Sequence, residues 1–324
     1  MYRKIIFDLD GVITSESAFW DAAALTVAEF MGFPMDTPTR LRETLFCHDK
    51  LIRLVKNRGV NSNWDLVYLF YCFFETTPEA VYETIEKSGL CDFALYEAAG
   101  QYAARKTGKP HAEIRRGGPL YREMANSFQE WFLGSETFEK VNAKTPRGNR
   151  EGLWLMEEPI VGREKLLSTL AFLKERGLSL RIATARPLPE GREPLVRWGA
   201  MVYFDADGAI TYDYIRRAQA LSPDVPLGKP HPYIFLKSYF GKDFPDTAIL
   251  KGQYDCDFSD CLIVGDAGAD LFAAKKMGAD FAAVLTGISG EDGRAFFEEN
   301  GAKYILPDVS ALLSIPDFGE EEQK

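Results

Sequence analysis

The rhythm of apolar and polar positions changes twice along the 324-residue chain. Residues 4–9 are strand-like, because the apolar run 5–7 is short and continuous, as in a strand covered on both faces of a parallel sheet. From about residue 16 to residue 158, apolar side chains recur at helical spacing without an alternating segment of strand length. Within this block, residues 106–119, with their glycines and prolines, are expected to form a loop. The pattern predicts one strand followed by a large helical block.

After residue 159, short apolar runs alternate with helical segments. The expected strands are residues 178–183, 201–204, 261–264 and 281–285, and the expected helices are residues 163–176, 233–240 and 271–277. Gly177 and Gly278 follow two of these helices, at the position where glycine commonly ends a helix. Residues 249–260 are expected to be a surface loop. This alternation predicts an α/β fold with a doubly wound, Rossmann-like parallel sheet.

The sheet domain is therefore expected to be split. It comprises residues 1–15 and 159–316, the inserted helical domain comprises residues 16–158, and residues 317–324 are expected to be a frayed tail. The insertion follows the carboxyl end of the first strand, which is the edge where open α/β sheets bind ligands. We therefore expect the helical block to act as a lid.

Composition narrows the class of protein. A hydrophobic share of 46% with 27% charged residues is that of a globular chain, which excludes global disorder. The net charge of −10 argues against a nucleic-acid partner, and the longest apolar run, residues 66–74, is too short to span a membrane. The strand-like start leaves no room for a signal peptide, and the five cysteines have no zinc-finger spacing. We therefore expect free thiols in a reducing cytoplasm.

Polar residues follow three of the expected strands, and a lysine precedes a helix between two of them. They are Asp8, Asp10, Thr184, Lys229, Asp266 and Asp270. Each alone is commonly a turn, cap or surface residue, so the prediction depends on their joint order. Carboxylates that converge repel one another unless a cation neutralises them, and one lysine is not enough.

Oxygen ligands point to the identity of this cation. The carboxylates of Asp8 and Asp266 with a backbone carbonyl suit Mg²⁺, and we expect Asp8, Asp10 and Asp266 to form the metal site. Zinc would need histidine or cysteine ligands, and the three histidines are scattered along the chain.

Four segments in this order resemble the motifs of the haloacid dehalogenase (HAD) superfamily of phosphohydrolases. They are residues 8–14 (DLDGVIT), 182–186 (IATAR), 228–232 (GKPHP) and 264–270 (VGDAGAD). The helical block lies where this superfamily carries an inserted helical cap. It is larger than a typical cap, and residues 15–17 (SES) replace the Asp-Ser pair that often opens it. The substrate is therefore not inferred from relatives.

The resemblance implies a role for each motif residue. Asp8 would attack phosphorus and become an aspartyl phosphate, and Asp10 would protonate the leaving oxygen and then activate water. The implied roles of the others are phosphate binding by Thr184 and the Ala185 backbone, charge stabilisation by Lys229, metal binding by Asp266, and orientation of Lys229 or of a metal-bound water by Asp270. True dehalogenases of this superfamily lack the second aspartate, so Asp10 favours phosphate chemistry.

Three arginines are candidates for further substrate contacts. Residues 105–122 carry six basic residues against Glu113 alone, and Arg115 and Arg116 in this segment are candidates to grip a second anionic group. The alternative is a solvated loop on the cap. Arg186 follows Thr184 closely and is a candidate phosphate contact, or else a surface residue at the start of a helix.

These inferences converge on a Mg²⁺-dependent phosphatase that acts on a small phosphorylated metabolite. One alternative is a phosphomutase of the β-phosphoglucomutase type, which would isomerise a sugar phosphate rather than release phosphate. The other is a non-catalytic binding protein on the same fold. The intact set of motif residues argues against this alternative, because a protein without catalysis has no need to keep these carboxylates together. We expect no nucleic-acid, membrane or obligate protein partner.

Overall fold

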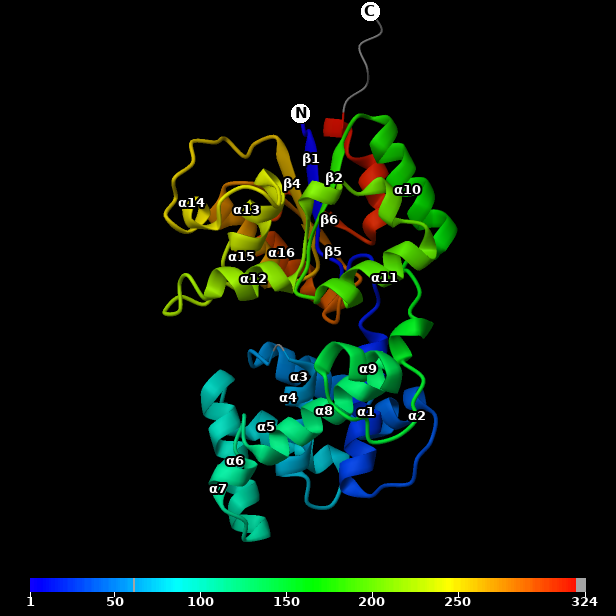
Figure 1. Ribbon diagram of the computed structural model, residues 1–324, viewed down its shortest axis with the longest axis vertical. Helices are drawn as coiled ribbons and strands as arrows, with labels where there is room; N and C mark the ends of the chain where they lie inside the picture. The colour runs from blue at the N-terminus through cyan, green and yellow to red at the C-terminus, as the bar shows by residue number, and fades with distance from the viewer. Residues whose placement is uncertain (61, 319–324) are drawn as a thin grey trace, which may run out of the picture. The chain divides into compact units, whose positions relative to one another are not determined.

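The computed structural model describes residues 1–60 and 62–318 (Figure 1). Contacts between residues divide the chain into two compact units. The core unit comprises Met1–Glu16 and the chain from Glu158 onward, and the cap unit comprises Ser17–Glu157. Within the described residues, no helix combines the length and hydrophobicity needed to cross a membrane.

The core unit is built on a six-stranded sheet in the order β3-β2-β1-β4-β5-β6, in which every pair of neighbours is parallel. The strands are β1 (Lys4–Phe7), β2 (Ser179–Ala183), β3 (Ala209–Ile210), β4 (Cys261–Gly265), β5 (Asp280–Val284) and β6 (Tyr304–Leu306). At the centre, Phe7 of β1 lies opposite Ile182 of β2 and Val264 of β4. This confirms the predicted doubly wound parallel sheet.

Helices cover both faces of the sheet because successive side chains of a strand point to opposite sides. Ile5 and Phe7 belong to one buried cluster and Ile6 belongs to the other. The first cluster contains residues of α10 (Arg163–Glu175), α11 (Leu188–Trp198) and the 3₁₀ helix η5 (Val309–Ser314). The second contains residues of α12 (Tyr212–Gln219), α13 (Tyr233–Phe240), α14 (Asp246–Leu250), α15 (Gly268–Met277) and α16 (Arg294–Glu299). The other 3₁₀ helices of the core unit are η2 (Met201–Tyr203), η3 (Ala206–Gly208), η4 (Gly290–Gly293) and η6 (Pro316–Phe318).

Three predictions about the core unit were wrong. Residues 201–204 are not a strand: they contain η2, where Val202 is 82% exposed, and the neighbouring position in the sheet is taken by β3. Residues 249–260 are only partly a surface loop, because Phe258 is buried among aromatic rings. The chain stays ordered through Phe318, which is buried against Tyr2, so the tail predicted from residue 317 does not begin there. Residues 319–324 of that predicted tail lie outside the described residues.

The cap unit is helical throughout. Its elements are α1 (Ser17–Met31), α2 (Pro38–Leu45), α3 (Lys50–Asn57), α4 (Asn63–Phe73), α5 (Pro78–Ser88), α6 (Asp92–Thr107), α7 (His111–Ile114), α8 (Pro119–Leu133), α9 (Ser135–Asn142) and the 3₁₀ helix η1 (Leu153–Met156). Helices α2, α4 and α8 pack on α1. The aromatic residues of α4 are largely buried, as Tyr68 and Phe70 show, so they form cap core. The predicted loop 106–119 was wrong in part, because α6 continues to Thr107 and α7 lies within it.

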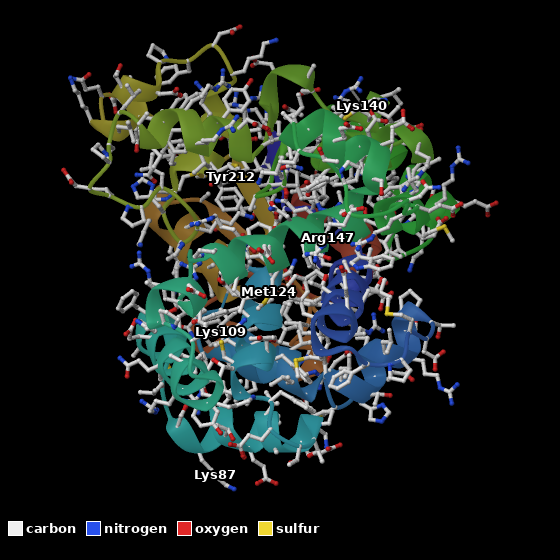
Figure 2. All side chains as sticks on the ribbon, turned by 60° about the horizontal axis from the view of Figure 1, so that its bottom comes forward. Lys87, Lys109, Met124, Lys140, Arg147 and Tyr212 are labelled. Atoms are coloured by element: carbon white, nitrogen blue, oxygen red, sulfur yellow. The ribbon has the colours of Figure 1, made fainter. Side chains whose placement is uncertain are left out.

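A buried carboxylate fastens the last part of the cap unit to its helices. Glu130 of α8 accepts hydrogen bonds from the backbone N–H groups of Arg147 (2.8 Å) and Gly148 (2.9 Å). Arg150 pairs with Glu130 at 3.6 Å and with Glu29 of α1 at 3.0 Å, and Arg147, labelled in Figure 2, also pairs with Glu29. The segment that follows α9 is therefore held by both α1 and α8.

The two connections between the units run side by side within the core unit. The N–H of Ile160 donates to the carbonyl oxygen of Ile13 at 3.0 Å, and Thr14 forms an isolated bridge with Pro159. This pairing fixes the segment that carries Asp10 relative to the start of α10.

Candidate active site

The predicted site residues follow the central strands of the core unit directly. Asp8 follows β1, Thr184 follows β2 and Asp266 follows β4. Because β1 lies between β2 and β4 and all three are parallel, the three residues lie at one edge of the sheet. The Asp8 N–H continues the ladder by donating to the Val264 carbonyl at 2.9 Å.

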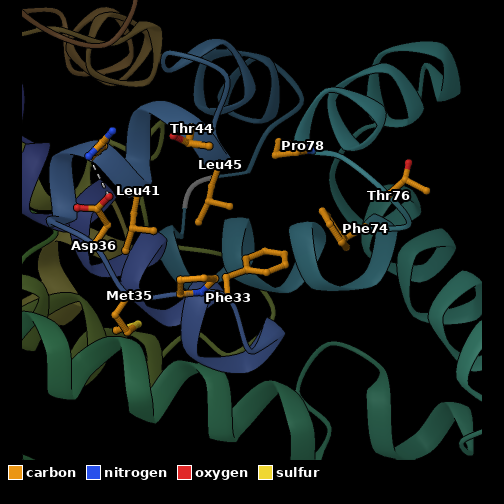
Figure 3. A pocket seen from close by; sticks show the side chains of 11 residues that line it. Phe33, Met35, Asp36, Leu41, Thr44, Leu45, Phe74, Thr76 and Pro78 are labelled. Atoms are coloured by element: carbon orange, nitrogen blue, oxygen red, sulfur yellow. Dashed lines mark ion pairs between the residues drawn. The ribbon is translucent and has the colours of Figure 1, made fainter.

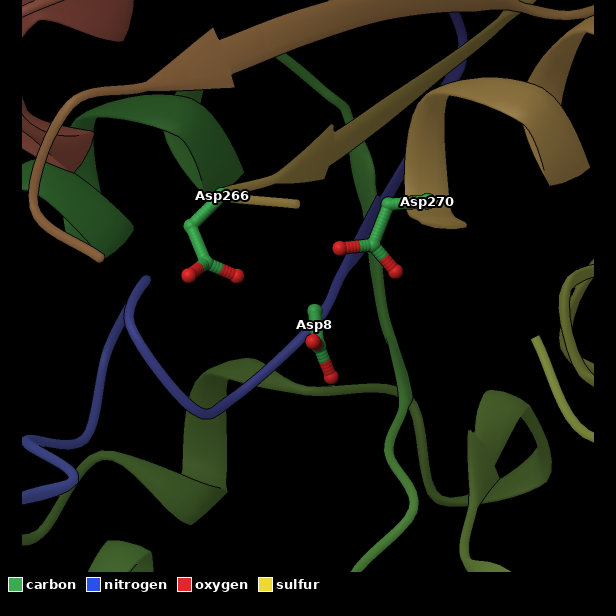
Figure 4. Close-up of side chains that lie close together, drawn as sticks. All are labelled: Asp8, Asp266 and Asp270. Atoms are coloured by element: carbon green, nitrogen blue, oxygen red, sulfur yellow. The ribbon is translucent and has the colours of Figure 1, made fainter. Parts of the chain in front are cut away.

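Three carboxylates converge at this edge (Figure 4). One oxygen each of Asp8, Asp266 and Asp270 lies within 4.8 Å of the others. Asp270 is 1% exposed on the first turn of α15, where its Oδ2 accepts from the Ala267 N–H at 3.4 Å. The third carboxylate of the cluster is thus that of Asp270, whereas the predicted metal set contained Asp10 in its place.

Lys229 lies between two of these carboxylates. Its Nζ is 2.9 Å from Asp8 Oδ1 and 2.8 Å from Asp270 Oδ1, above the ring of Phe235. Burial opposes the charge of the ammonium group, but the carboxylates of Asp270 and Asp8 outweigh it and raise the Lys229 pKa. Lys229 is therefore a fixed positive charge beside Asp8.

Burial also acts on Asp8. It raises the pKa of this carboxyl, Lys229 lowers it, and the neighbouring charges of Asp270 and Asp10 raise it further, with a net upward shift. The protein's own cations thus leave the Asp8 carboxylate incompletely neutralised.

Arg186 lies in the same site and is only 2% exposed, so the interpretation as a surface residue was wrong. Its Nε and Nη2 donate to Asp10 Oδ1 at 2.9 and 2.6 Å. Its backbone N–H donates to the Oγ1 of Thr184, which is completely buried at the end of β2, whereas Ala185 is exposed. The sequence placed Arg186 near phosphate, and the structure places its guanidinium on Asp10.

Sequence reasoning missed Thr286 and Gly287. Thr286 Oγ1 donates to the carbonyl oxygen of Gly11 at 2.5 Å. A Cβ atom would lie 1.9 Å from Asp266 Oδ2 at Gly287 and 2.3 Å at Gly11, where φ is also +72°. Only glycine leaves room for the Asp266 carboxylate at these two positions. Both missed residues follow the strand expected at 281–285, so reading every strand end would have found them.

The two arginine candidates of the cap differ in their surroundings. Arg116 donates from Nε and Nη2 to the two carboxylate oxygens of Asp65, both at 2.9 Å, and its guanidinium lies over the Tyr96 ring. Asp65 is 1% exposed and also accepts from the Tyr121 hydroxyl. The fork that was predicted to grip an anionic group is therefore occupied within the cap, while Arg115 is exposed beside it. Lys109 of the same basic segment is exposed (Figure 2).

We expect Arg116→Met to lower the free energy of unfolding by roughly 2–3 kcal/mol, because it leaves the buried Asp65 carboxylate without its bidentate partner. Urea unfolding of the full chain measures this loss. Arg115→Met, at the exposed neighbour, should change stability by less than about 0.5 kcal/mol. Equal stability of the two variants would show that the Arg116–Asp65 pair does not stabilise the cap.

A separate hollow of about 490 Å³ lies in the cap unit (Figure 3). Its lining is mainly apolar, with Phe33, Leu41 and Phe74 among its side chains, and Asp36 and Arg40 form an ion pair of 3.4 Å. The lining contains no carboxylate pair and no histidine or cysteine. The chemical groups expected of a catalytic site are therefore those of the core unit.

A doubly wound sheet with carboxylates and a lysine at the carboxyl ends of its central strands defines a class of hydrolytic α/β enzyme. A family model described as HAD-hydrolase-like matches residues 226–312, which include Lys229, Asp266 and Asp270. This match confirms the resemblance of the motifs to the HAD-like hydrolases.

Solved structures share the fold over almost the whole chain. The X-ray structure of the Northeast Structural Genomics Consortium target ZR25 is 26% identical, with a TM-score of 0.86 and coverage of 97% of this chain and 98% of that chain. A predicted phosphoglycolate phosphatase from Haemophilus somnus is 16% identical, with a TM-score of 0.51 and coverage of 97% of both chains, and shares the fold. No curated protein matches the sequence.

Proposed function

We propose that this hydrolase is a Mg²⁺-dependent phosphatase that acts on a small phosphorylated metabolite through an aspartyl phosphate on Asp8. The observation that carries the proposal is the contact of Lys229 with both Asp8 and Asp270, beside Asp266, at the carboxyl edge of the sheet. The name of the Haemophilus somnus neighbour, a predicted phosphoglycolate phosphatase, agrees with a small phosphorylated substrate.

The charges of the site fit a divalent cation. Four carboxylates, those of Asp8, Asp10, Asp266 and Asp270, lie near two cationic side chains, those of Lys229 and Arg186. The cluster offers oxygen ligands alone, which favours Mg²⁺ over zinc. Asp8 and Asp266 are the residues that would hold it, with Asp270 adjacent. When bound, Mg²⁺ would supply positive charge that offsets the charge of Asp8 and of the phosphoryl oxygens.

The chain's own residues then account for the two chemical steps. An Asp8 oxygen attacks phosphorus, and Lys229 offsets the charge on the nucleophile and on the transferring group. Thr184 Oγ1 and the N–H of Ala185 hold phosphoryl oxygens. Asp10 protonates the leaving oxygen and then takes a proton from the water that releases phosphate.

The test is phosphate release from a panel of phosphorylated metabolites, with Mg²⁺ or with EDTA. We expect release with Mg²⁺ and none with EDTA. We also expect Mg²⁺ at about 100 times its dissociation constant to raise the free energy of unfolding by about 2.7 kcal/mol, and Asp266→Asn to remove this gain. Isomerised sugar phosphate without free phosphate would favour a mutase, and no turnover with no effect of Mg²⁺ on stability would favour a binding protein.

Gly287→Ala tests the packing of the proposed metal ligand. The new methyl group would meet Asp266 Oδ2, so we expect about 10–100-fold weaker Mg²⁺ affinity, as is usual when support of a metal ligand is disturbed. The Mg²⁺ concentration that gives half the maximal rate measures this effect. Gly148→Ala in the cap unit is the control, because its Cβ atom would meet only Arg150, at 3.7 Å. Unchanged Mg²⁺ affinity in Gly287→Ala would remove Asp266 from the metal site.

A further inference from the structure

We infer that Arg186 is a positioning residue that determines which oxygen of Asp10 transfers the proton. The inference rests on the proposed phosphatase function, because it concerns the acid–base step of that reaction. It concerns only residues of the core unit.

All the hydrogen bonds of the Asp10 carboxylate among the described residues end on one oxygen. Oδ1 accepts from Arg186 Nε at 2.9 Å, from Arg186 Nη2 at 2.6 Å and from Thr14 Oγ1 at 3.1 Å. A carboxylate oxygen has two lone pairs, so three donors saturate Oδ1 and leave no place for a proton there. Oδ2 is therefore the oxygen left to take part in the acid–base step.

Arg186 is itself held on three sides. Its side chain is 2% exposed, its Nη1 donates to the carbonyl oxygen of Glu190 at 3.3 Å, and its backbone N–H donates to Thr184 Oγ1 at 3.1 Å. The acid–base carboxylate is thus connected through one buried arginine to the residue proposed to bind phosphate. A carboxylate without these donors would be free to rotate and to present either oxygen, which lowers the fraction of time in the productive orientation.

The two proton transfers of the proposed reaction show which substrates need a correctly oriented Asp10. In the first step, the bond between an Asp8 oxygen and phosphorus forms, the bond from phosphorus to the leaving oxygen breaks, and the Oδ2 proton moves to that oxygen. In the second step, water attacks phosphorus, its proton moves to Oδ2, and the bond from Asp8 to phosphorus breaks. A leaving group that is already a stable anion does not need the first of these protons.

The experiment compares the phosphorylation step of wild type and Arg186→Met on two substrates, followed by rapid quench. One is the alkyl phosphate that wild type hydrolyses fastest, and the other is acetyl phosphate, whose leaving group is a stable anion. We expect Arg186→Met to slow this step by about 10²-fold with the alkyl phosphate, the lower end of a general-acid effect, and far less with acetyl phosphate. Arg186→Lys, which retains a donor and a charge, should recover part of the loss.

Further variants distinguish an effect of Arg186 on the orientation of Asp10 from a general effect on the fold. In an Asp10→Asn background, Arg186→Met should cause no additional slowing with the alkyl phosphate, because the group through which it acts is gone. Arg181→Met removes another largely buried arginine of the core unit, which donates to the carbonyl oxygens of Ser238 and Tyr239, and should not discriminate between the substrates. If Arg186→Met does not fold, Thr14→Val removes the third donor and should show the same dependence on the leaving group, to a smaller extent.

Equal slowing of both substrates, or full additivity with Asp10→Asn, would overturn the inference while leaving the phosphatase proposal intact. A wild-type enzyme that releases phosphate from no substrate would instead overturn the phosphatase proposal, and the role of Arg186 with it.

Discussion

Asp8→Asn is expected to abolish phosphate release, with a loss in kcat of roughly 10⁴-fold or more, as is usual when a nucleophile is removed. The amide has nearly the shape of the carboxylate but cannot attack phosphorus, so the loss should be in kcat. Steady-state phosphate release measures it, and near-UV circular dichroism confirms that the variant is folded.

The control for Asp8→Asn is Asp243→Asn, which makes the same chemical change at an exposed position of the core unit. Its kcat should equal that of wild type. Activity of Asp8→Asn within a few-fold of wild type would mean that another group is the nucleophile, and the role given to the strand-end aspartate would be wrong.

Lys229→Met is expected to reduce both activity and stability. Without the ammonium group, the buried carboxylates of Asp8 and Asp270 lose the cation that lies 2.9 and 2.8 Å from them. Breaking a buried ion pair by removing one partner costs about 3–5 kcal/mol of unfolding free energy. Urea unfolding in the absence of Mg²⁺ measures this loss. It should shrink as the pH falls, because burial raises the pKa of Asp8 to about 7 and protonation then neutralises this carboxylate.

A second buried lysine of the core unit is the matched control. Lys237 pairs with Asp246 at 2.8 Å and is nearly inaccessible to solvent, but it is not among the site residues. Lys237→Met should lose stability comparably and keep the wild-type kcat at a temperature where it is folded. Equal loss of kcat in both variants would mean that Lys229 acts only through the fold.

The central strands and the site residues that follow them were predictable from the sequence, because buried apolar runs mark both. Strands β1 and β4 contain continuous buried apolar runs, so the aspartate that follows each of them stands out. Strand β2 is interrupted by the half-buried Arg181, but its last two residues are buried and apolar and Thr184 follows them. Parallel pairing then places Asp8, Thr184 and Asp266 at one edge, whatever the details of the loops. Strands β3 and β6 were not predictable, because two and three residues give no periodicity.

Pairings between residues distant along the chain were also beyond sequence reasoning. Asp10 and Arg186 are 176 positions apart, and Asp65 and Arg116 are 51 apart. The sequence left a surface role open for both arginines. Arg186 is in fact 2% exposed, whereas the Arg116 side chain remains 46% exposed while it pairs with the buried Asp65. The partner becomes visible only when the packing of β1 against β2, or of α4 against α8, is known.

The aspartyl phosphate on Asp8 is the central claim, and trapping it is the most direct test. Asp10→Asn is expected to slow hydrolysis of the intermediate, because it removes the proposed base. The variant is mixed with Mg²⁺ and acetyl phosphate and then reduced with borohydride, which converts an aspartyl phosphate to homoserine. Peptide mass spectrometry should find homoserine at position 8, only when acetyl phosphate is present, and not in the Asp8→Asn, Asp10→Asn double variant. Homoserine at another aspartate, or none at position 8 while the wild-type enzyme releases phosphate, would contradict the account.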